Sequence, residues 1–224
     1  MEIALQSSIL STAQSMAQFS YSVLIINQKK LSMKKVIFAV SLFAAVSFIV
    51  SCNQSGSTDS TTIAKDANAQ KIDSNLINDS ITRDTKFAVA VANGGMAEVQ
   101  ISQLALSKSA NYDVKQLAQM MVEDHTKANQ ALKELAAKKN ITLPATISDE
   151  KQKKYDKLAS ESGSDFDTDY ADCMVDDHTS TIDLFKKEAN NGNDSDIKAW
   201  ATAIIPTLEH HLEMADSTKA RVNR

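Results

Sequence analysis

Four side chains that can bind a metal ion occur at inward-facing positions of predicted helices. Hydrophobic residues recur at steps of three and four along four long segments, a spacing that puts them on one face of a helix. Each apolar stripe contains one carboxylate or imidazole group: Glu98, His125, His178 and His211. The chain has four histidines, and the remaining one, His210, is adjacent to this set. The pattern predicts a polar cluster inside a helical bundle.

The predicted depths of these groups along the bundle agree. At about 1.5 Å of rise per residue, Glu98 and His125 fall within about one turn of the same level on either side of a chain reversal near Ala110. His178 and His211 match more loosely about Gly192. A buried polar group without a partner costs on the order of 1–3 kcal/mol, so either an ion or mutual pairing must satisfy the cluster.

A six-residue segment around one histidine occurs twice. Met121–Thr126 has the sequence MVEDHT, and Met174–Thr179 has the sequence MVDDHT. The repeat indicates an internal duplication that produces two similar helical hairpins, which then pair face to face.

Two interpretations of the cluster follow from the residue types. In the first, the four residues bind a metal ion, and Asp124, Asp177 and His210 orient the imidazoles from behind. In the second, Asp124 and Asp177 pair with the imidazoles in a buried hydrogen-bond network that needs no ion and fixes the register of the bundle.

The ligand types leave the metal open between iron, zinc and copper. Imidazole and carboxylate alone suit iron, manganese or zinc. Met121 and Met174 each lie one helical turn before a histidine, and thioether ligands favour copper, to which Cys173 would add a thiolate. Methionine also fills irregular gaps in hydrophobic cores, which is the simpler explanation of its positions.

The helical pattern predicts an all-α fold. Sustained alternation is missing, so strands are not indicated. We expect an antiparallel four-helix bundle with a short extra helix between its second and third helices. The expected helices cover about residues 80–109, 112–139, 149–160 and 164–190, and a fourth long helix starts near Asp194 or Ser195 with an apolar stripe from Ile197 to Ala215. Asn111 and Asp194 or Ser195 are the expected N-caps, and Ser164 with Asp167 resembles a capping box.

The N-terminal part resembles a bacterial lipoprotein signal. Met33-Lys34-Lys35 precedes fifteen residues, 36–50, that are apolar apart from two serines, and Cys52 follows Ser51. This stretch is too short for a membrane span and has the layout of a secretory signal. We expect lipid on Cys52 and an envelope location that faces the periplasm. Asn53, in place of Asp, favours the outer membrane by analogy with lipoprotein sorting.

These features divide the chain into three parts. Residues 1–51 form the signal segment, of which 1–32 has no evident role and is consistent with a start codon assigned too far upstream. Residues 52–76 are rich in Ser, Thr, Asn and Asp and predict a flexible, lipidated tether. Residues 77–224 form the bundle domain, a size that suits one hydrophobic core.

Composition and motifs exclude several classes of function. The formal net charge is −4, and an acidic chain without Lys/Arg clusters is unsuited to nucleic acid. The membrane, through Cys52, and an envelope protein remain as partners. Gly-X-Ser-X-Gly and Gly-rich phosphate loops are missing, and Cys173 lies too far round the helix from His178 for easy proton transfer.

Five motifs resemble the bacterial domain-of-unknown-function family 4142. They are Phe87 with Gly95-Met96-Ala97-Glu98-Val99, Met121–Thr126, Phe166-Asp167 with Tyr170, Asp177-His178, and Leu208–Leu212. The resemblance covers about residues 80–215. It implies a ferritin-like fold and export, because members are often labelled predicted outer-membrane proteins, and it marks the same four residues. It implies no reaction.

One departure argues against a di-iron oxidase. Ferritins carry Glu-X-X-His on two helices, whereas Val122 and Val175 stand three positions before His125 and His178. We therefore predict a lipid-anchored periplasmic protein with a His/Glu metal site that buffers or senses metal. The alternative is a non-catalytic envelope interaction module with a structural buried polar network.

Overall fold

The computed structural model describes residues 59–71 and 79–223. The predicted signal segment 1–51 and the predicted lipid-bearing Cys52 lie outside these residues. Within the described ranges every regular element is a helix. None of these helices combines the length and the apolar character that a membrane span requires.

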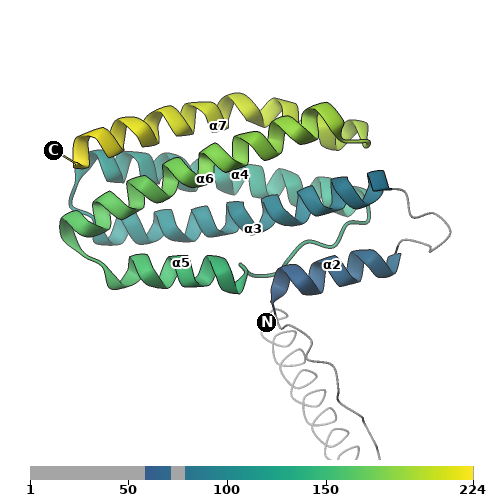
Figure 1. Cartoon of the computed structure of the whole chain (residues 1–224), viewed down its shortest axis with the longest axis horizontal. Helices are drawn as coiled ribbons and strands as arrows, with labels where there is room; N and C mark the ends of the chain where they lie inside the picture. The colour runs from purple at the N-terminus through teal and green to yellow at the C-terminus, as the bar shows by residue number, and fades with distance from the viewer. Residues whose placement is uncertain (1–58, 72–78, 224) are drawn as a thin grey trace, which may run out of the picture. The chain divides into compact units, whose positions relative to one another are not determined.

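Four long helices form the bundle, as the sequence predicts (Figure 1). They are α3 (Asp79–Lys108), α4 (Tyr112–Lys138), α6 (Gly163–Asn191) and α7 (Ser195–Val222). Helix α3 pairs with α4 and α6 pairs with α7 as hairpins, and the two hairpins pack through α4 against α7 and α3 against α6. Helices α4 and α6 therefore run in the same direction, and the repeated segment lies on these two helices.

Short capped turns force the antiparallel pairing. Asn111 accepts hydrogen bonds from two backbone N–H groups at the start of α4, at 2.9 and 3.2 Å. Asp194 does the same at the start of α7, and Asp84 of α3 accepts from the backbone of Asn193 and Asp194. These bonds satisfy amides that a helix N-terminus leaves unpaired, and they hold the second turn against the first hairpin.

The short extra helix α5 (Asp149–Ser160) lies on the crossover between the hairpins, as predicted. Ser148 caps it by accepting from the Lys151 amide at 3.3 Å. The helix packs on α3 and α6. Lys151 and Lys154 of α5 both pair with Asp177 of α6, at 3.2 and 2.8 Å.

The predicted capping box at the start of the third long helix is wrong. Helix α6 begins at Gly163, and its N-cap is Ser162, whose side chain makes no capping hydrogen bond. Gly163 adopts a φ of 62°, a left-handed conformation that costs residues with a Cβ more than glycine. The chain therefore reverses on glycine rather than through a box of Ser164 and Asp167.

The predicted tether 52–76 is wrong over Ser60–Lys71, which forms helix α2 and packs against α3 (Figure 1). This helix buries little apolar surface, and Ala64 is its only buried hydrophobic residue among those described. It docks through polar contacts. The Asn68 side chain accepts from the Thr142 amide at 2.7 Å and donates to the Thr142 carbonyl at 2.8 Å. The polar composition of this segment led to the wrong prediction of a flexible tether, because the helix is held by hydrogen bonds to Thr142 rather than by an apolar face.

The hydrophobic core has two main parts, one toward each end of the bundle. One cluster contains Ile101, Met121 and Met174, and the other contains Phe87 and Phe185. On each of the four helices, the residue singled out by the sequence pattern stands between these two clusters. The four polar groups therefore form a layer across the bundle.

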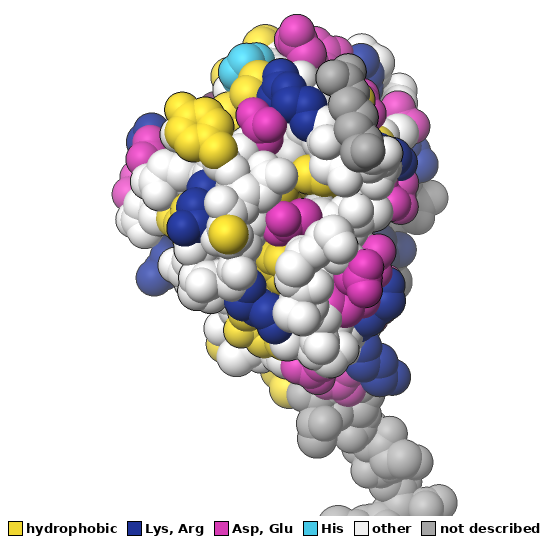
Figure 2. Space-filling model, turned by 90° about the vertical axis from the view of Figure 1, so that its left-hand side faces the viewer, with side chains coloured by type: hydrophobic (Ala, Val, Ile, Leu, Met, Phe, Trp, Pro, Cys, Tyr) yellow, Lys and Arg dark blue, Asp and Glu magenta, His cyan; other side chains and the backbone are white. Residues whose placement is uncertain are grey.

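The face in Figure 2, at the end where α3 turns into α4, carries interspersed acidic and basic side chains.

A buried carboxyl group lies near the turn between α6 and α7. Glu188 is 2% exposed, and its Oε1 atom has no hydrogen-bond partner among the described residues. Burial raises the pKa of Glu188 to about 7, and the nearby Asp84 adds to this increase. The folded protein therefore holds this proton more tightly than an unfolded chain would.

We predict that Glu188→Gln changes how stability depends on pH. A raised folded-state pKa contributes stability at acid pH, and this contribution is lost as the pH rises through about 7. Glutamine is neutral throughout, so the variant should gain melting temperature relative to wild type between pH 5 and pH 8. Parallel melting curves measure this, and an unchanged difference at the two pH values would refute the assignment.

Candidate metal centre

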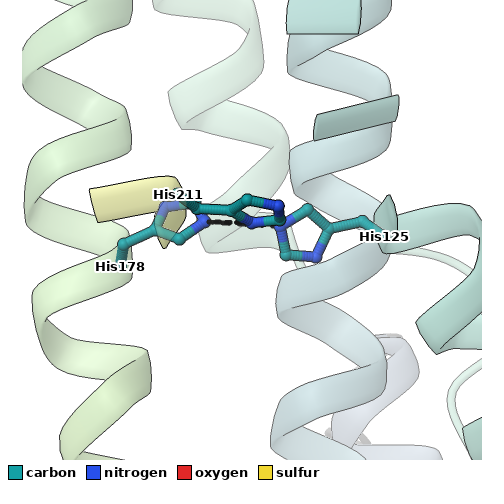
Figure 3. Close-up of side chains that lie close together, drawn as sticks. All are labelled: His125, His178 and His211. Atoms are coloured by element: carbon teal, nitrogen blue, oxygen red, sulfur yellow. Dashed lines mark hydrogen bonds between the residues drawn. The ribbon is translucent and has the colours of Figure 1, made fainter. Parts of the chain in front are cut away.

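The structure brings the four sequence-predicted residues together in the core. Each comes from a different helix, and their exposed fractions are 3% for Glu98, 6% for His125, 0% for His178 and 1% for His211. The three imidazoles point toward one another from α4, α6 and α7 (Figure 3). The predicted convergence of the histidines is confirmed.

One nitrogen of each ring faces a common point. His125 Nε2 and His178 Nε2 are 3.3 Å apart, and His178 Nε2 and His211 Nδ1 are also 3.3 Å apart. Taking one ring nitrogen from each histidine, the three ligand atoms lie within 4.8 Å of one another. Nitrogens bound to one tetrahedral ion at 2.0–2.1 Å are about 3.3–3.4 Å apart, so both close contacts already have the separation of ligands on a shared ion.

The other nitrogen of each ring is held by an oxygen acceptor. The three contacts are His125 Nδ1 to Glu98 Oε2 at 3.1 Å, His178 Nδ1 to the Met174 carbonyl at 2.8 Å, and His211 Nε2 to Asp124 Oδ2 at 3.2 Å. A backbone carbonyl or an ionised carboxylate can only accept, so the proton of a neutral imidazole belongs on this outer nitrogen. The inner nitrogens then carry three unshared electron pairs that face each other.

Burial keeps the imidazoles neutral at physiological pH. It lowers the pKa of His125 and His211 to about 4, and it lowers the pKa of His178 as well. Burial alone would raise the pKa of Asp124, but hydrogen bonds from His211 and Lys127 bring it below its ordinary value. Asp124 is therefore ionised and holds the proton of His211 on Nε2.

A hydrogen-bond network without a metal ion leaves one contact between two ring nitrogens without a proton. Burial raises the pKa of Glu98 to about 7, so a protonated Glu98 can donate to His125 Nδ1. His125 Nε2–H then donates to His178 Nε2. The contact between His178 Nε2 and His211 Nδ1 still joins two acceptors, because Met174 and Asp124 hold the protons of these rings on their outer nitrogens. A cation at the centre satisfies all three nitrogens together.

Glu98 lies behind His125 rather than at the centre. Its Oε2 atom lies 3.1 Å from His125 Nδ1, the outer nitrogen of that ring. Among the described residues, the group of side chains whose ligand atoms come together consists of the three histidines. Glu98, which the sequence predicted as a fourth ligand, therefore lies where it orients the ring of His125. The two residues sit at nearly the same depth on neighbouring helices, which turns the carboxylate toward the imidazole edge.

Of the three predicted orienting residues, only Asp124 has that position. It accepts from His211 of α7, not from its own neighbour His125. His210 is exposed, and its nearest acidic partner is Glu213 at 4.0 Å. The predicted orienting role of His210 is wrong because it lies about 100° round α7 from His211, the angle between consecutive helical residues.

Asp177, the repeat equivalent of Asp124, is directed elsewhere. It pairs with Lys151 and Lys154 and accepts from the Cys173 thiol at 3.7 Å, so its predicted role beside an imidazole is wrong. Asp124, the residue before the histidine on α4, faces α7, whereas Asp177, its equivalent on α6, faces α5. The crossover helix therefore breaks the symmetry of the duplication.

The sulfur ligands considered from the sequence do not join the centre. Burial raises the pKa of the Cys173 thiol to about 12, which opposes the thiolate form that metals bind. Met121 and Met174 belong to the hydrophobic cluster. Met174 contributes instead through its backbone carbonyl, a contact that no side-chain pattern announces.

The fold and the site together define an all-helical bundle with a buried triad of histidines. The family described as a domain of unknown function (DUF4142) matches residues 67–218. The chain belongs to this family, as its motifs suggested.

One solved structure shares the fold. It is the crystal structure of a DUF305 fragment from Deinococcus radiodurans, with a TM-score of 0.56 and 11% sequence identity, covering 62% of this chain and 96% of that chain. At this identity the likeness concerns the fold alone. The search of curated proteins found no match.

We predict that Asp124→Ala weakens metal binding about 10- to 100-fold, the usual effect of removing the acceptor behind a ligating histidine. Asp177→Ala is the matched control, because it changes the equivalent residue of the repeat without touching an imidazole. Competition with a chromophoric chelator measures both affinities. The control should keep wild-type affinity while its melting temperature falls, and equal losses in the two variants would contradict the assignment.

Proposed function

We propose that this chain binds one divalent transition-metal ion through His125 Nε2, His178 Nε2 and His211 Nδ1. The observation that carries the proposal is the convergence of these three nitrogens while their outer N–H groups are held by acceptors. Metal-binding histidines are usually oriented in this manner by carboxylates or backbone carbonyls.

The donor set limits the ions that fit. Neutral imidazole suits zinc, copper and iron, whereas the oxygen ligands that magnesium and calcium prefer would be missing. Three protein ligands also leave a coordination position open, which is typical of sites that exchange a water or a substrate rather than of closed structural sites. The proposed role is to bind and buffer or sense such an ion, with ligand exchange at the open position.

The proposed setting is the bacterial cell envelope. The supporting features are the basic residues 34–35, the apolar stretch 36–50 and the cysteine at position 52. In this proposal the chain is exported and cleaved before Cys52. Lipid on that residue then holds the helical domain on the periplasmic side of the outer membrane.

We predict that the purified full chain binds one zinc or cobalt ion and that His178→Ala abolishes this binding. His178 is the central residue, since its Nε2 contacts both other rings. Free metal at 100 times its Kd should stabilise the wild type by about 2.7 kcal/mol, a rise in melting temperature of roughly 5–10 °C. Elemental analysis and melting curves provide the measurements.

His210→Ala is the control for this experiment, because it removes an exposed imidazole next to the site in sequence. It should retain full stoichiometry. If wild type shows no bound metal and no change in melting temperature on metal addition or chelation, the cluster is a structural network and the alternative of an envelope interaction module replaces the metal site.

A further inference from the structure

A cavity of about 350 Å³ lies beside the histidine cluster. All four bundle helices contribute to it. Glu98, His125 and His211 are among its lining residues. Hydrophobic side chains line much of the rest, among them Val91, Phe185, Ile204 and Leu208. The cavity thus joins two of the three proposed ligands to an apolar compartment.

Gly94 of α3 lines this cavity one helical turn before Glu98. A Cβ atom built on Gly94 would meet no atom within 4 Å, so close packing does not require glycine there. The next residue differs, since a Cβ on Gly95 would collide with the Asn129 side chain. Glycine inside a helix is less stable than alanine. Because a Cβ on Gly94 would meet open space that belongs to the cavity, this space is available to a ligand.

The charges around the cavity set the charge of a suitable ligand. Its charged lining residues among those described are Glu98, Asp124 and Lys127. With an ion bound, Glu98 accepts from His125 Nδ1 as a carboxylate, so the two carboxylates and one ammonium sum to one negative charge. A divalent ion held by neutral imidazoles adds two positive charges, which leaves one positive charge in excess. A ligand with one negative charge neutralises the site.

We infer that the cavity admits a small monoanion that coordinates the proposed ion through an oxygen head and packs an apolar body against the hydrophobic wall, as a short-chain monocarboxylate does. This inference rests on the proposed metal site. A water in the liquid occupies about 30 Å³, so the cavity holds a ligand of roughly ten non-hydrogen atoms. The oxygen would occupy the position that the three histidines leave open.

The test uses the purified full chain loaded with cobalt(II), whose visible spectrum reports changes in coordination. Titrations with formate, acetate, butyrate and hexanoate should shift the spectrum. The affinity should rise about fourfold for each methylene group that enters the cavity. Binding without dependence on chain length would overturn the inference, and so would an unchanged spectrum with every carboxylate.

Gly94→Leu tests whether these ligands use the cavity. The added side chain should fill the space near Gly94 and weaken hexanoate binding more than tenfold, while the cobalt stoichiometry stays at the wild-type value. Gln100→Leu is the matched control, because it adds leucine at an exposed position of the same helix. Hexanoate binding that survives in Gly94→Leu would refute the inference.

The cobalt experiments distinguish a failure of the proposed metal site from a failure of the inferred ligand. A wild-type chain that binds no cobalt refutes the metal site and the inference that rests on it. A chain that binds cobalt with an unchanged spectrum in every titration refutes only the ligand.

Discussion

Three unshared electron pairs on three imidazole nitrogens face one point in a buried core, and the rest of the site depends on this constraint. The pairs converge when an outer acceptor holds the proton of each ring: ionised Glu98, ionised Asp124 and the Met174 carbonyl. Such an arrangement is unfavourable while empty and favourable around a cation. The acceptors come from three different helices, so the register of the whole bundle determines whether the centre can form.

The fold maintains that register by separating its apolar contacts into two main parts. One cluster lies toward the turn between α3 and α4, the other toward the turn between α6 and α7, and the polar layer crosses between them. Capped turns at both ends fix the helix pairs. The crossover helix α5 takes Asp177 away from the centre. The result is an asymmetric site made from a repeated sequence, with one carboxylate behind a histidine of α7 and another behind a histidine of α4.

Periodicity and capping residues predicted the helices and the meeting of the histidines, because both are encoded along single helices. The roles within the cluster depended on information between helices. Asp124 and Asp177 occupy equivalent positions, each about 100° round its helix from the following histidine. They nevertheless face different helices, because Asp124 of α4 contacts α7 and Asp177 of α6 contacts α5. Helix α2 escaped prediction since its docking uses polar bonds from Asn68 rather than an apolar stripe. The sequence placed Gly94 on the inward face of its helix but did not predict the open space beside it, because that space depends on how the other helices pack.

Nitrogen NMR of the histidine rings in the zinc-loaded chain tests the central claim most directly. We predict a mixed pattern, in which His125 and His178 bind through Nε2 with protonated Nδ1, and His211 binds through Nδ1 with protonated Nε2. The ring nitrogens should show these tautomers through their chemical shifts and two-bond couplings to the ring protons. Zinc that leaves the shifts of these rings unchanged, or a proton on the inner nitrogen of any of the three rings, would contradict it.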